Sequence, residues 1–376
     1  MKIGLLLPGF SSRSDDWAIP VQQNLIRELA AQDNVRVIAL RYPHQHTPYT
    51  LDGASVYPLG AGQVRGISRL RLWWNTLRLI RTLHRQEPFD ILHAMWADET
   101  GLLAVWASRQ LGIPVVVSIL GGELVALAEI SYGLQRSRFS RWIVGQALQA
   151  NRILVPGSYI RSLIGSAGYR IPASKIVTIT LGVDADRFTP SPAPAEPNRL
   201  IHVASLVPVK DQETLLSAFA LLDPRTTLDI LGTGSEQPKL EALALKLGIS
   251  ERVHFLGAVA HPDLPTYYHR ASIAVLSSRH ESLALVTLEA AACGVPVVST
   301  NVGIARDYPS IGVTVPVGDA PALAQAIKSL IDAPTRRQTF SISARVTIER
   351  ELTIQHTAAA LRALYTELIP GFTTNI

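Results

Sequence analysis

The feature that most constrains the fold is a regular alternation of two kinds of segment. Residues 2–7 (KIGLLL) have the pattern of a buried strand, residues 21–32 repeat apolar side chains about every 3.6 residues, and residues 35–40 return to strand character. The same alternation continues along most of the 376 residues. Strands separated by helices predict parallel sheets with helices on both faces. The predicted fold class is therefore α/β, with Rossmann-like domains.

A proline-rich stretch interrupts the alternation. Four prolines fall within residues 190–197, where they disfavour both helix and strand pairing. We therefore expect the linker between two domains at this stretch, with a first domain over residues 1–190 and a second over residues 191–352. The last helix, at about 353–368, has no strand after it and would be free to cross back onto the first domain. Residues 353–376 are predicted to do so.

Composition narrows the class of protein. With 47% hydrophobic and 17% charged residues, a chain of this length can bury a full core, which excludes disorder. The single cysteine, Cys293, cannot form an internal disulfide and favours a reducing, cytoplasmic compartment. The apolar run at the start meets Pro8 too early for a signal peptide, and no apolar stretch reaches the roughly 20 residues of a bilayer span. We expect a cytoplasmic protein that is soluble or rests on a membrane surface.

The net charge of +5 is unevenly distributed. Residues 1–190 hold 20 Lys and Arg against 13 Asp and Glu, and the remainder holds 15 against 17. On a helix, four of these arginines would share one side with Trp74: Arg71, Arg78, Arg81 and Arg85. A solvated outer face is the simpler interpretation, and a helix resting on anionic lipid headgroups is the alternative. Nucleic acid is not an expected partner, because the aromatic platforms and helix-turn-helix context of base contact are missing.

The most informative stretch is residues 280–298, HESLALVTLEAAACGVPVV. It predicts a loop at a strand end carrying Glu281, then a helix carrying Glu289, then a Gly-Val-Pro stop before a strand. Two carboxylates so placed could accept hydrogen bonds from two separate sets of hydroxyls, while backbone N–H groups of residues 283–286 hold an anion between them. That arrangement suits a sugar, a diphosphate and a ribose.

Glu281 and Glu289 are spaced as an E-x7-E motif, and the surrounding sequence resembles the retaining glycosyltransferases of family 4, which have the GT-B fold. Five further segments agree in order and spacing: LGVDADRFTP, VASLVPVKDQETLL, LDILGTGSEQPKL, RVHFLGAV and GVTVPVGDAPALAQAI. The resemblance covers the second domain almost completely and the first loosely. It implies a metal-independent hexosyltransferase without a cofactor. The donor would be a UDP-, GDP- or ADP-sugar, and the acceptor a carbohydrate or a lipid-linked molecule.

The resemblance also implies roles for individual residues. The two predicted catalytic residues are Glu281, at hydroxyls of the transferred hexose, and Lys210, at the diphosphate, while Glu289 would contact the ribose. The remaining predicted donor-binding residues are Ser205, Gly232, Gly234, Leu283, Ala284, Leu285 and Val286. At two of these positions the chain departs from the family, which has Arg where Ser205 stands and usually Gly where Ala284 stands.

Two short patterns suggest other chemistry. Asp184 and Asp186 match the D-x-D of metal-dependent transferases, but two carboxylates without further oxygen ligands make a poor metal site. Gly232-Thr233-Gly234 partly matches a dinucleotide fingerprint but lacks its third glycine and its acidic residue. A tight turn or a close backbone approach to phosphate explains both glycines. We therefore expect neither a metal nor a nicotinamide cofactor.

The acceptor side departs further from the family. Asp16 and Trp17 stand where the family has two glycines, and Leu120 stands where many members have His. Trp17 could stack on an acceptor sugar while Asp16 holds its hydroxyls, or the loop could be an ordinary surface loop with Trp17 in a domain interface. Three further acceptor-side candidates are His93, Asp98 and Glu123, although a buried His93 satisfied by the backbone is the commoner outcome.

These departures leave two other functions open. One is a non-catalytic partner protein that binds a sugar nucleotide without transferring the sugar. The other is a sugar-nucleotide epimerase of similar fold, which would need no acceptor. Turnover separates the partner protein from the two enzymes, and an epimer released without an acceptor identifies the epimerase.

Overall fold

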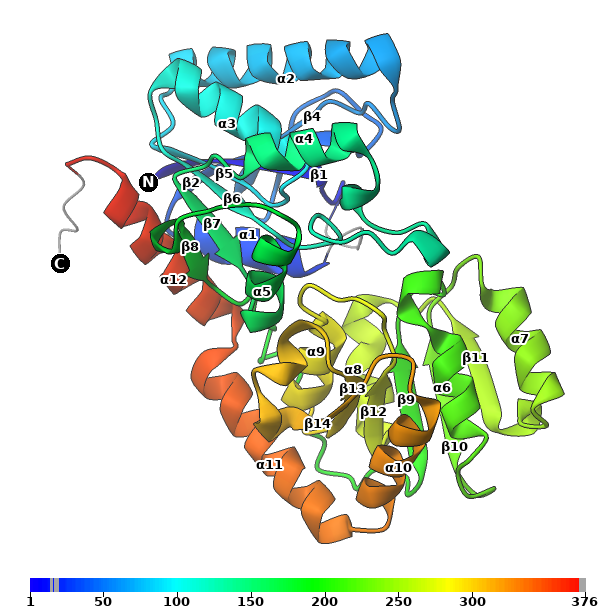
Figure 1. The fold of residues 1–376 in the computed structure, drawn as a ribbon. Helices are drawn as coiled ribbons and strands as arrows, with labels where there is room; N and C mark the ends of the chain where they lie inside the picture. Colours follow the sequence, from blue (N-terminus) through cyan, green and yellow to red (C-terminus); the bar gives the residue numbers. More distant parts are fainter. Residues whose placement is uncertain (14–15, 17–19, 372–376) are drawn as a thin grey trace. The chain divides into compact units, whose positions relative to one another are not determined.

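A computed structural model describes residues 1–13, 16 and 20–371 and divides the chain into two compact units (Figure 1). Unit 1 comprises Met1–Thr180 and Ile354–Ile376, and unit 2 comprises Leu181–Thr353. Each has its own sheet and its own hydrophobic core. The predicted α/β class is confirmed.

Unit 1 is built on an eight-stranded sheet of order β3-β4-β2-β1-β5-β6-β7-β8. All neighbouring strands pair in parallel except β3 and β4, which are antiparallel. Their bounds are β1 (Lys2–Gly9), β2 (Asn34–Tyr42), β3 (Tyr49–Leu51), β4 (Ala54–Pro58), β5 (Ile91–Ala94), β6 (Val115–Ser118), β7 (Arg152–Val155) and β8 (Ile176–Thr178). Central strands such as β5 and β6 are buried along their whole length, as sheets covered on both faces require.

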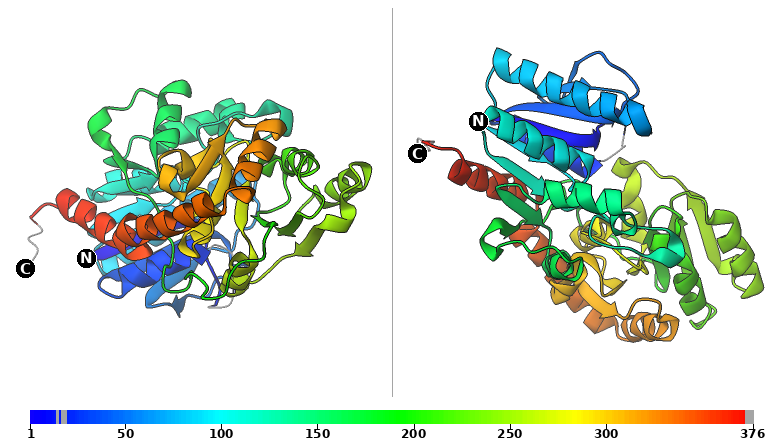
Figure 2. Two further views of the ribbon diagram at one scale, coloured as in Figure 1. Left: turned by 90° about the horizontal axis from the view of Figure 1, so that it is seen from below. Right: turned by 45° about the horizontal axis from the view of Figure 1, so that its top comes forward.

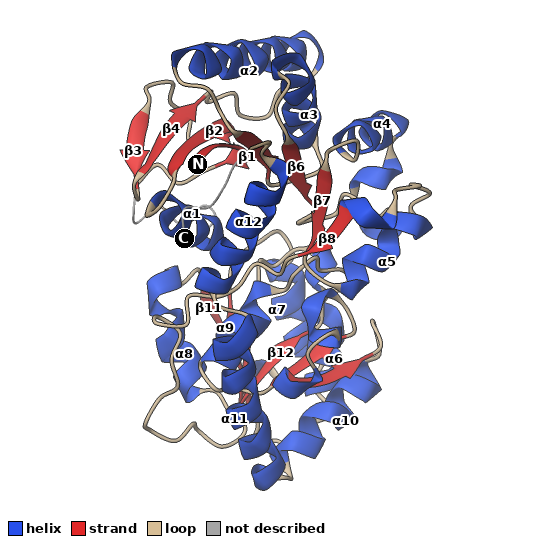
Figure 3. Cartoon of the chain, turned by 90° about the vertical axis from the view of Figure 1, so that its left-hand side faces the viewer, coloured by secondary structure: helices blue, strands red, loops and turns tan. Residues whose placement is uncertain are grey.

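Helices cover both faces of this sheet. Their bounds are α1 (Pro20–Ala30), α2 (Gly66–Gln86), α3 (Glu99–Leu111), α4 (Arg138–Ala147), α5 (Ser158–Ser166) and α12 (Ile354–Leu368). The helices α2, α3 and α4 lie over one face, and α1 and α12 lie over the other (Figure 3).

The last helix, α12, packs on unit 1 beside α1 (Figure 2). Its Arg362 Nε lies 3.0 Å from Asp33 Oδ2, and its Thr357 hydroxyl donates to the carbonyl oxygen of Thr180 at 2.8 Å. The predicted return of the C-terminal helix to the first domain is therefore confirmed.

Unit 2 is built on a six-stranded parallel sheet of order β11-β10-β9-β12-β13-β14. Its strands are β9 (Arg199–Val203), β10 (Thr227–Leu231), β11 (Val253–Gly257), β12 (Ile273–Leu276), β13 (Val297–Thr300) and β14 (Gly312–Val315). Its helices are α6 (Gln212–Phe219), α7 (Gln237–Lys246), α8 (Leu264–Arg270), α9 (Leu285–Ala292), α10 (Ala320–Ile331) and α11 (Pro334–Glu351). The strand order reverses between β9 and β12, which is where doubly wound sheets bind ligands.

The boundary between the units lies at 180/181, ten residues before the predicted division at 190. Residues after Thr180 already pack inside unit 2: Val183 N donates to Leu352 O at 2.9 Å, and Phe188 is fully buried. The proline-rich stretch follows the surface of the same unit and lines a cavity of about 420 Å³ there. The prolines exclude regular structure but do not mark a free linker.

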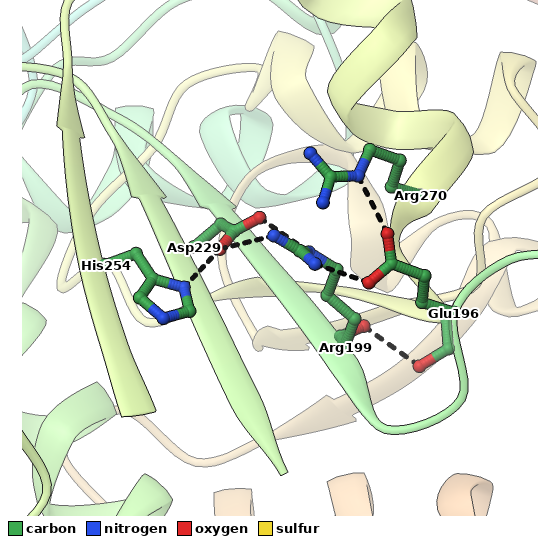
Figure 4. A network of polar contacts seen from close by, with 6 residues as sticks. Glu196, Arg199, Asp229, His254 and Arg270 are labelled. Atoms are coloured by element: carbon green, nitrogen blue, oxygen red, sulfur yellow. Dashed lines mark hydrogen bonds and ion pairs between the residues drawn. The ribbon is translucent and has the colours of Figure 1, made fainter. Parts of the chain in front are cut away.

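A network of charged side chains fastens the end of that stretch (Figure 4). Asp229 accepts from Arg199 Nε at 2.8 Å and lies 2.8 Å from His254 Nδ1, joining β9, β10 and β11. Glu196 pairs with Arg199 and accepts from Arg270 Nε at 2.8 Å. Arg270 is the last residue of α8, so the network ties the chain before β9 to that helix.

Candidate functional site

The loops after β9 and β12 meet at the strand-order reversal of unit 2. Ser277 Oγ donates to Lys210 O at 2.9 Å, and Arg279 N donates to Val209 O at 2.8 Å. These bonds hold the two loops in register although their residues lie about 70 apart in the chain. The predicted catalytic residues come from these two loops.

Lys210 and Glu281 form an ion pair at this point. Lys210, at the end of a short 3₁₀ turn (Pro208–Lys210), places Nζ 2.5 Å from Glu281 Oε1. Ser278 Oγ donates to the same carboxylate oxygen at 2.7 Å. Both charged side chains keep some exposure, 24% for Lys210 and 12% for Glu281. An ammonium carries three N–H donors, so a lysine fixed by one of them can also bind an anion.

The start of α9 lies directly after Glu281 in the chain. Ala284 precedes the helix in the left-handed conformation, with φ 64° and ψ 57°, and its carbonyl accepts from Thr287 Oγ1 at 2.7 Å. The first turn then contains Leu285 and Val286, whose N–H groups lie at the positive end of the helix dipole. Leu283 and Ala284 are buried. The residues predicted to hold an anion, 283–286, thus lie just before and within the first turn of α9.

Ala284 occupies a position that favours glycine. An L-residue with a Cβ pays about 1–2 kcal/mol in the left-handed region, whereas glycine pays little. The family's glycine at this position therefore has a backbone reason, separate from any room needed for phosphate. Gly303 supports the same loop, because a Cβ there would lie 3.0 Å from Leu283 O.

Glu289 lies within α9, and only 6% of the residue is exposed. Its Oε1 lies 2.8 Å from His261 Nε2, and its Oε2 accepts from the Tyr268 hydroxyl at 3.1 Å. Phe188 packs edge-on against both of these rings. Burial raises the pKa of Tyr268 well above its ordinary value of 10, so the hydroxyl stays a donor. The ribose contact of Glu289 remains a prediction, now with a carboxylate already oriented by two side chains.

A buried histidine supports the loop that carries Ser205 and Lys210. His202 Nδ1 donates to Val275 O at 2.9 Å, and Gln212 Nε2 lies 3.2 Å from His202 Nε2 and 3.1 Å from Ser205 O. Burial lowers the pKa of His202 to about 4, so the ring is neutral and Nε2 accepts from Gln212. Ser205 itself is exposed. Its hydroxyl adds no positive charge to the site.

Gly232 and Gly234 allow two loops to touch. A Cβ on Gly232 would lie 1.9 Å from Ala204 O, and one on Gly234 would lie 2.2 Å from Leu206 O. These glycines therefore let the loop after β10 pack on the loop after β9, which carries Ser205. The close approach that these glycines permit is to protein backbone, whereas the sequence suggested phosphate or a tight turn. Their contact with a donor remains a prediction.

In unit 1, Asp16 organises the loop after β1. Its Oδ2 accepts from Ser12 N, from Ser12 Oγ and from the Tyr42 hydroxyl, each at 2.7 Å. The bond to Asp16 raises the pKa of Tyr42. Trp17, the other predicted acceptor residue of this loop, lies outside the described residues.

His93 is a core histidine. It is 1% exposed, with Nδ1 2.6 Å from the Tyr365 hydroxyl and Nε2 2.8 Å from Ser118 Oγ. Burial lowers its pKa to about 3. Both ring nitrogens are thus engaged by side chains of the protein, and the acceptor contact considered for His93 remains a prediction. The partners are side chains, not the backbone groups that we expected.

Asp98 and Glu123 hold loops at the strand ends. Asp98 caps α3 by accepting from Thr100 N at 2.8 Å, and burial raises its pKa. Glu123 accepts from Leu120 N at 3.1 Å and from Gly121 N at 2.6 Å, and burial raises its pKa to about 7. Glu123 is 1% exposed, so its first role is to fix the loop after β6 that contains Leu120. An acceptor contact by either carboxylate remains a prediction.

Comparison with known proteins identifies the family. Residues 19–182 match the glycosyl transferase 4-like domain, and residues 184–347 match glycosyl transferases group 1. D-inositol 3-phosphate glycosyltransferase of Saccharomonospora viridis is 30% identical over 79% of this chain and 75% of its own length. The chain belongs to the group 1 glycosyltransferases. It is an enzyme of the family 4 type that depends on a sugar nucleotide.

Solved structures agree on the fold of this glycosyltransferase. Sucrose-phosphate synthase of Thermosynechococcus elongatus matches with a TM-score of 0.80 and 20% identity, over 98% of this chain and 99% of the other. HepE of Anabaena, solved in complex with UDP-glucose, matches with a TM-score of 0.75 and 19% identity, over 98% and 100%. The predicted GT-B architecture is confirmed.

The described part of this glycosyltransferase contains neither a membrane-spanning helix nor a cluster of metal ligands. Within residues 1–13, 16 and 20–371, no helix is long and apolar enough to cross a membrane. In the same ranges, no group of three or more His, Cys, Asp or Glu is arranged to hold a metal ion. Asp184, from the D-x-D pattern, instead accepts from Arg187 N at 3.1 Å.

Proposed function

We propose that this glycosyltransferase is retaining and metal-independent, and that it moves a hexose from a nucleoside diphosphate sugar to a hydroxyl of a glycan or lipid-linked acceptor. The observation that carries the proposal is the pair of Lys210 and Glu281 at the strand-order reversal of unit 2, next to the start of α9. The pair supplies a cation and a carboxylate from two loops that meet beside the backbone amides of the start of α9.

The charge that develops during transfer suits these groups. Breaking the bond between sugar and phosphate leaves negative charge on the departing diphosphate. The Lys210 ammonium and the positive end of α9 would stabilise that charge without a metal. Glu281, held by Lys210 and Ser278, would accept hydrogen bonds from hexose hydroxyls.

Retention follows if the acceptor attacks from the face that the diphosphate leaves. The acceptor oxygen forms the new bond to the anomeric carbon as the sugar–phosphate bond breaks. The acceptor proton passes to an oxygen of the departing phosphate, so the reaction balances without a protein base. This route is consistent with the loop-holding bonds of Asp98 and Glu123 and with the buried position of His93.

The base of the donor is open among uracil, guanine and adenine. Ser205 supplies no charge where the family has Arg, so diphosphate binding should depend strongly on Lys210. The acceptor panel should contain polyol phosphates such as inositol 3-phosphate, glycans and lipid-linked saccharides. We place the enzyme in the cytoplasm, at the inner face of the membrane when its acceptor is lipid-linked.

The product's stereochemistry tests the proposal. Purified enzyme is incubated with α-linked UDP-, GDP- and ADP-hexoses and the acceptor panel in EDTA, and the new glycosidic bond is assigned by proton NMR. We expect an α-linked product. Lys210→Ala should lower its formation at least a hundredfold, and Lys246→Ala, at an exposed position of α7, should leave it unchanged.

Two outcomes would count against it. A β-linked product would contradict retention, and activity only with added divalent cation would contradict metal independence. Binding of a sugar nucleotide without turnover on any acceptor would instead favour the non-catalytic partner.

A further inference from the structure

Unit 1 carries an exposed aromatic cluster on α4. Phe139 and Trp142 are 46% and 45% exposed, and their rings stack with centroids 6.0 Å apart. Phe139 also stacks on Trp73 of α2 at 6.4 Å, and Trp142 meets Trp106 of α3 edge-on at 6.3 Å. The two exposed rings are thus supported from below by the neighbouring helices, which hold them at the surface.

Apolar exposure continues along α2. Ile67, Leu70 and Trp74 are 71%, 60% and 57% exposed. At about 100° per residue these three fall within an arc of roughly 60° on the helix, opposite its buried residues Leu72 and Ile80. Solvent-exposed apolar residues grouped in this way mark an interaction surface.

Arginines surround these apolar groups. Neither α2 nor α4 contains an Asp or Glu, while together they contain Arg69, Arg71, Arg78, Arg81, Arg85, Arg138 and Arg141. Arg69 pairs with Glu99, and Arg81 donates to Gln110. The exposed arginines are Arg71, Arg78, Arg85, Arg138 and Arg141. Arg78 lies over the Trp74 ring, with its guanidinium carbon 5.3 Å from the ring centroid.

We propose that this surface of α2 and α4 docks the enzyme on an anionic lipid bilayer. Its aromatic and aliphatic members are Ile67, Leu70, Trp74, Phe139 and Trp142, and its basic members are the five exposed arginines. The proposal rests on the membrane-facing location stated under the proposed function and names the surface responsible. The aromatic pair on α4 extends the surface beyond the four arginines of α2 that the sequence indicated.

A bilayer fits the chemistry better than an acidic protein or nucleic acid. Tryptophan and phenylalanine enter the interface between headgroups and acyl chains, while the arginines around them contact lipid phosphates. Each arginine close to an anionic lipid surface raises the affinity for that surface by about fivefold. The rings and the arginines lie on two helices, α2 and α4, that touch through Trp73 and Phe139, so binding should need both the rings and the charge.

Vesicle flotation tests the proposal with two matched pairs of variants. The full chain is mixed with phosphatidylcholine vesicles, with or without 30% phosphatidylglycerol, at 50 mM salt. One variant is Phe139→Ala with Trp142→Ala, and its control is Leu221→Ala with Leu245→Ala, two leucines of unit 2 that are 63% and 71% exposed. The other is Arg71→Gln with Arg78→Gln, and its control is Arg161→Gln with Arg170→Gln, two exposed arginines of unit 1.

We expect the wild type and both controls to float with the phosphatidylglycerol vesicles only. The aromatic variant and the arginine variant should each bind the vesicles at least tenfold more weakly than the wild type. Brominated acyl chains should quench the tryptophan fluorescence of a Trp142→Phe variant less than that of the wild type. Thermal unfolding of every variant checks that it is folded. Nucleoside diphosphate binding, measured separately, keeps a failure of this proposal distinct from a failure of the proposed transfer reaction.

Three results would overturn the proposal. The first is that the wild type does not bind the phosphatidylglycerol vesicles at 50 mM salt. The second is that the aromatic variant and the arginine variant both bind them as well as the wild type does. The third is a wild type that does not bind vesicles but sediments as a dimer, while the aromatic variant sediments as a monomer. That result would assign the surface to a second copy of the chain.

Discussion

Ala284 combines a strained backbone with a position among the predicted donor-binding residues. Its φ of 64° places an alanine in the left-handed region directly before α9. The family resemblance indicated that glycine is usual at this position, and the backbone angle gives the reason. The residue marks a local conflict between sequence and conformation of the kind that collects at functional sites.

Replacing Ala284 with glycine should stabilise the protein. Relief of the left-handed strain, offset in part by the greater chain entropy of glycine, predicts a gain of about 0.5–1 kcal/mol in the free energy of unfolding. Urea denaturation of the variant measures it, with Ala242→Gly on helix α7 as a control that should lose stability by about 1 kcal/mol. A loss of stability in Ala284→Gly would mean that the Cβ packs better than its strain costs.

Sequence reasoning found the charged pair of the site but not its supports. Glu281 and Lys210 were predicted through the family resemblance, and the structure brings them to 2.5 Å. His261 and Tyr268, which hold Glu289, were not predicted. His261 lies in a turn and Tyr268 in α8. Tertiary contacts set how both pack against α9, and the sequence of residues 261–271 alone does not indicate that packing.

At the scale of elements, periodicity predicted the alternating helices and strands well. It passed over the short hairpin of β3 and β4, because a three-residue strand carries too little pattern. It also read the prolines at 190–197 as a linker. Those residues instead pack on unit 2, since prolines forbid ladder pairing but not packing.

The stability of the folded protein should depend on pH through His93, whose Nδ1 lies 2.6 Å from the Tyr365 hydroxyl of α12. Burial lowers the pKa of His93 from 6.5 to about 3, so the folded protein keeps the ring neutral. The contribution of the neutral ring to stability is complete above pH 6.5. It is lost as the pH falls toward 3, because the unfolded chain then binds a proton that the folded chain does not.

A His93→Gln variant isolates this effect. At pH 7.5 we expect it to be less stable than the wild type by about 1–3 kcal/mol, through weakened bonds to Tyr365 and Ser118. Below pH 6.5 the stability of the wild type relative to the variant should fall by about 1.4 kcal/mol per pH unit, so that the difference changes sign once this fall exceeds its value at pH 7.5, because only the wild type loses the His93 contribution. Urea denaturation at pH 7.5, 5.5 and 4.5 measures it, with exposed His44→Gln as the control.

Glu123 does not disturb this comparison. Its pKa is raised to about 7, so its contribution is present below pH 4.5 and is lost as the pH rises through 7, opposite to His93. Both proteins carry Glu123, and its effect cancels in the difference. A difference between wild type and His93→Gln that stays constant from pH 7.5 to 4.5 would contradict the assignment.

At the scale of the whole molecule, unit 2 is one continuous segment and unit 1 is made of two. The chain enters and leaves unit 2 side by side, since Val183 forms a β-bridge with Thr353 and a Cβ on Gly182 would lie 2.2 Å from Thr353 O. The final helix α12 then completes unit 1. All predicted donor-site residues lie in unit 2, and the acceptor-side candidates lie in unit 1.

The central claim is that Lys210 and its surroundings in unit 2 bind the diphosphate of a sugar nucleotide. Isothermal titration of the full chain with UDP, GDP and ADP tests it most directly, using the wild type, Lys210→Ala and the exposed control Lys246→Ala. We expect one nucleotide to bind the wild type and the control with equal affinity, and Lys210→Ala to bind it at least tenfold more weakly, the loss of one charge-assisted contact. Equal affinity in Lys210→Ala, or no binding of any of the three to the wild type, would contradict the account.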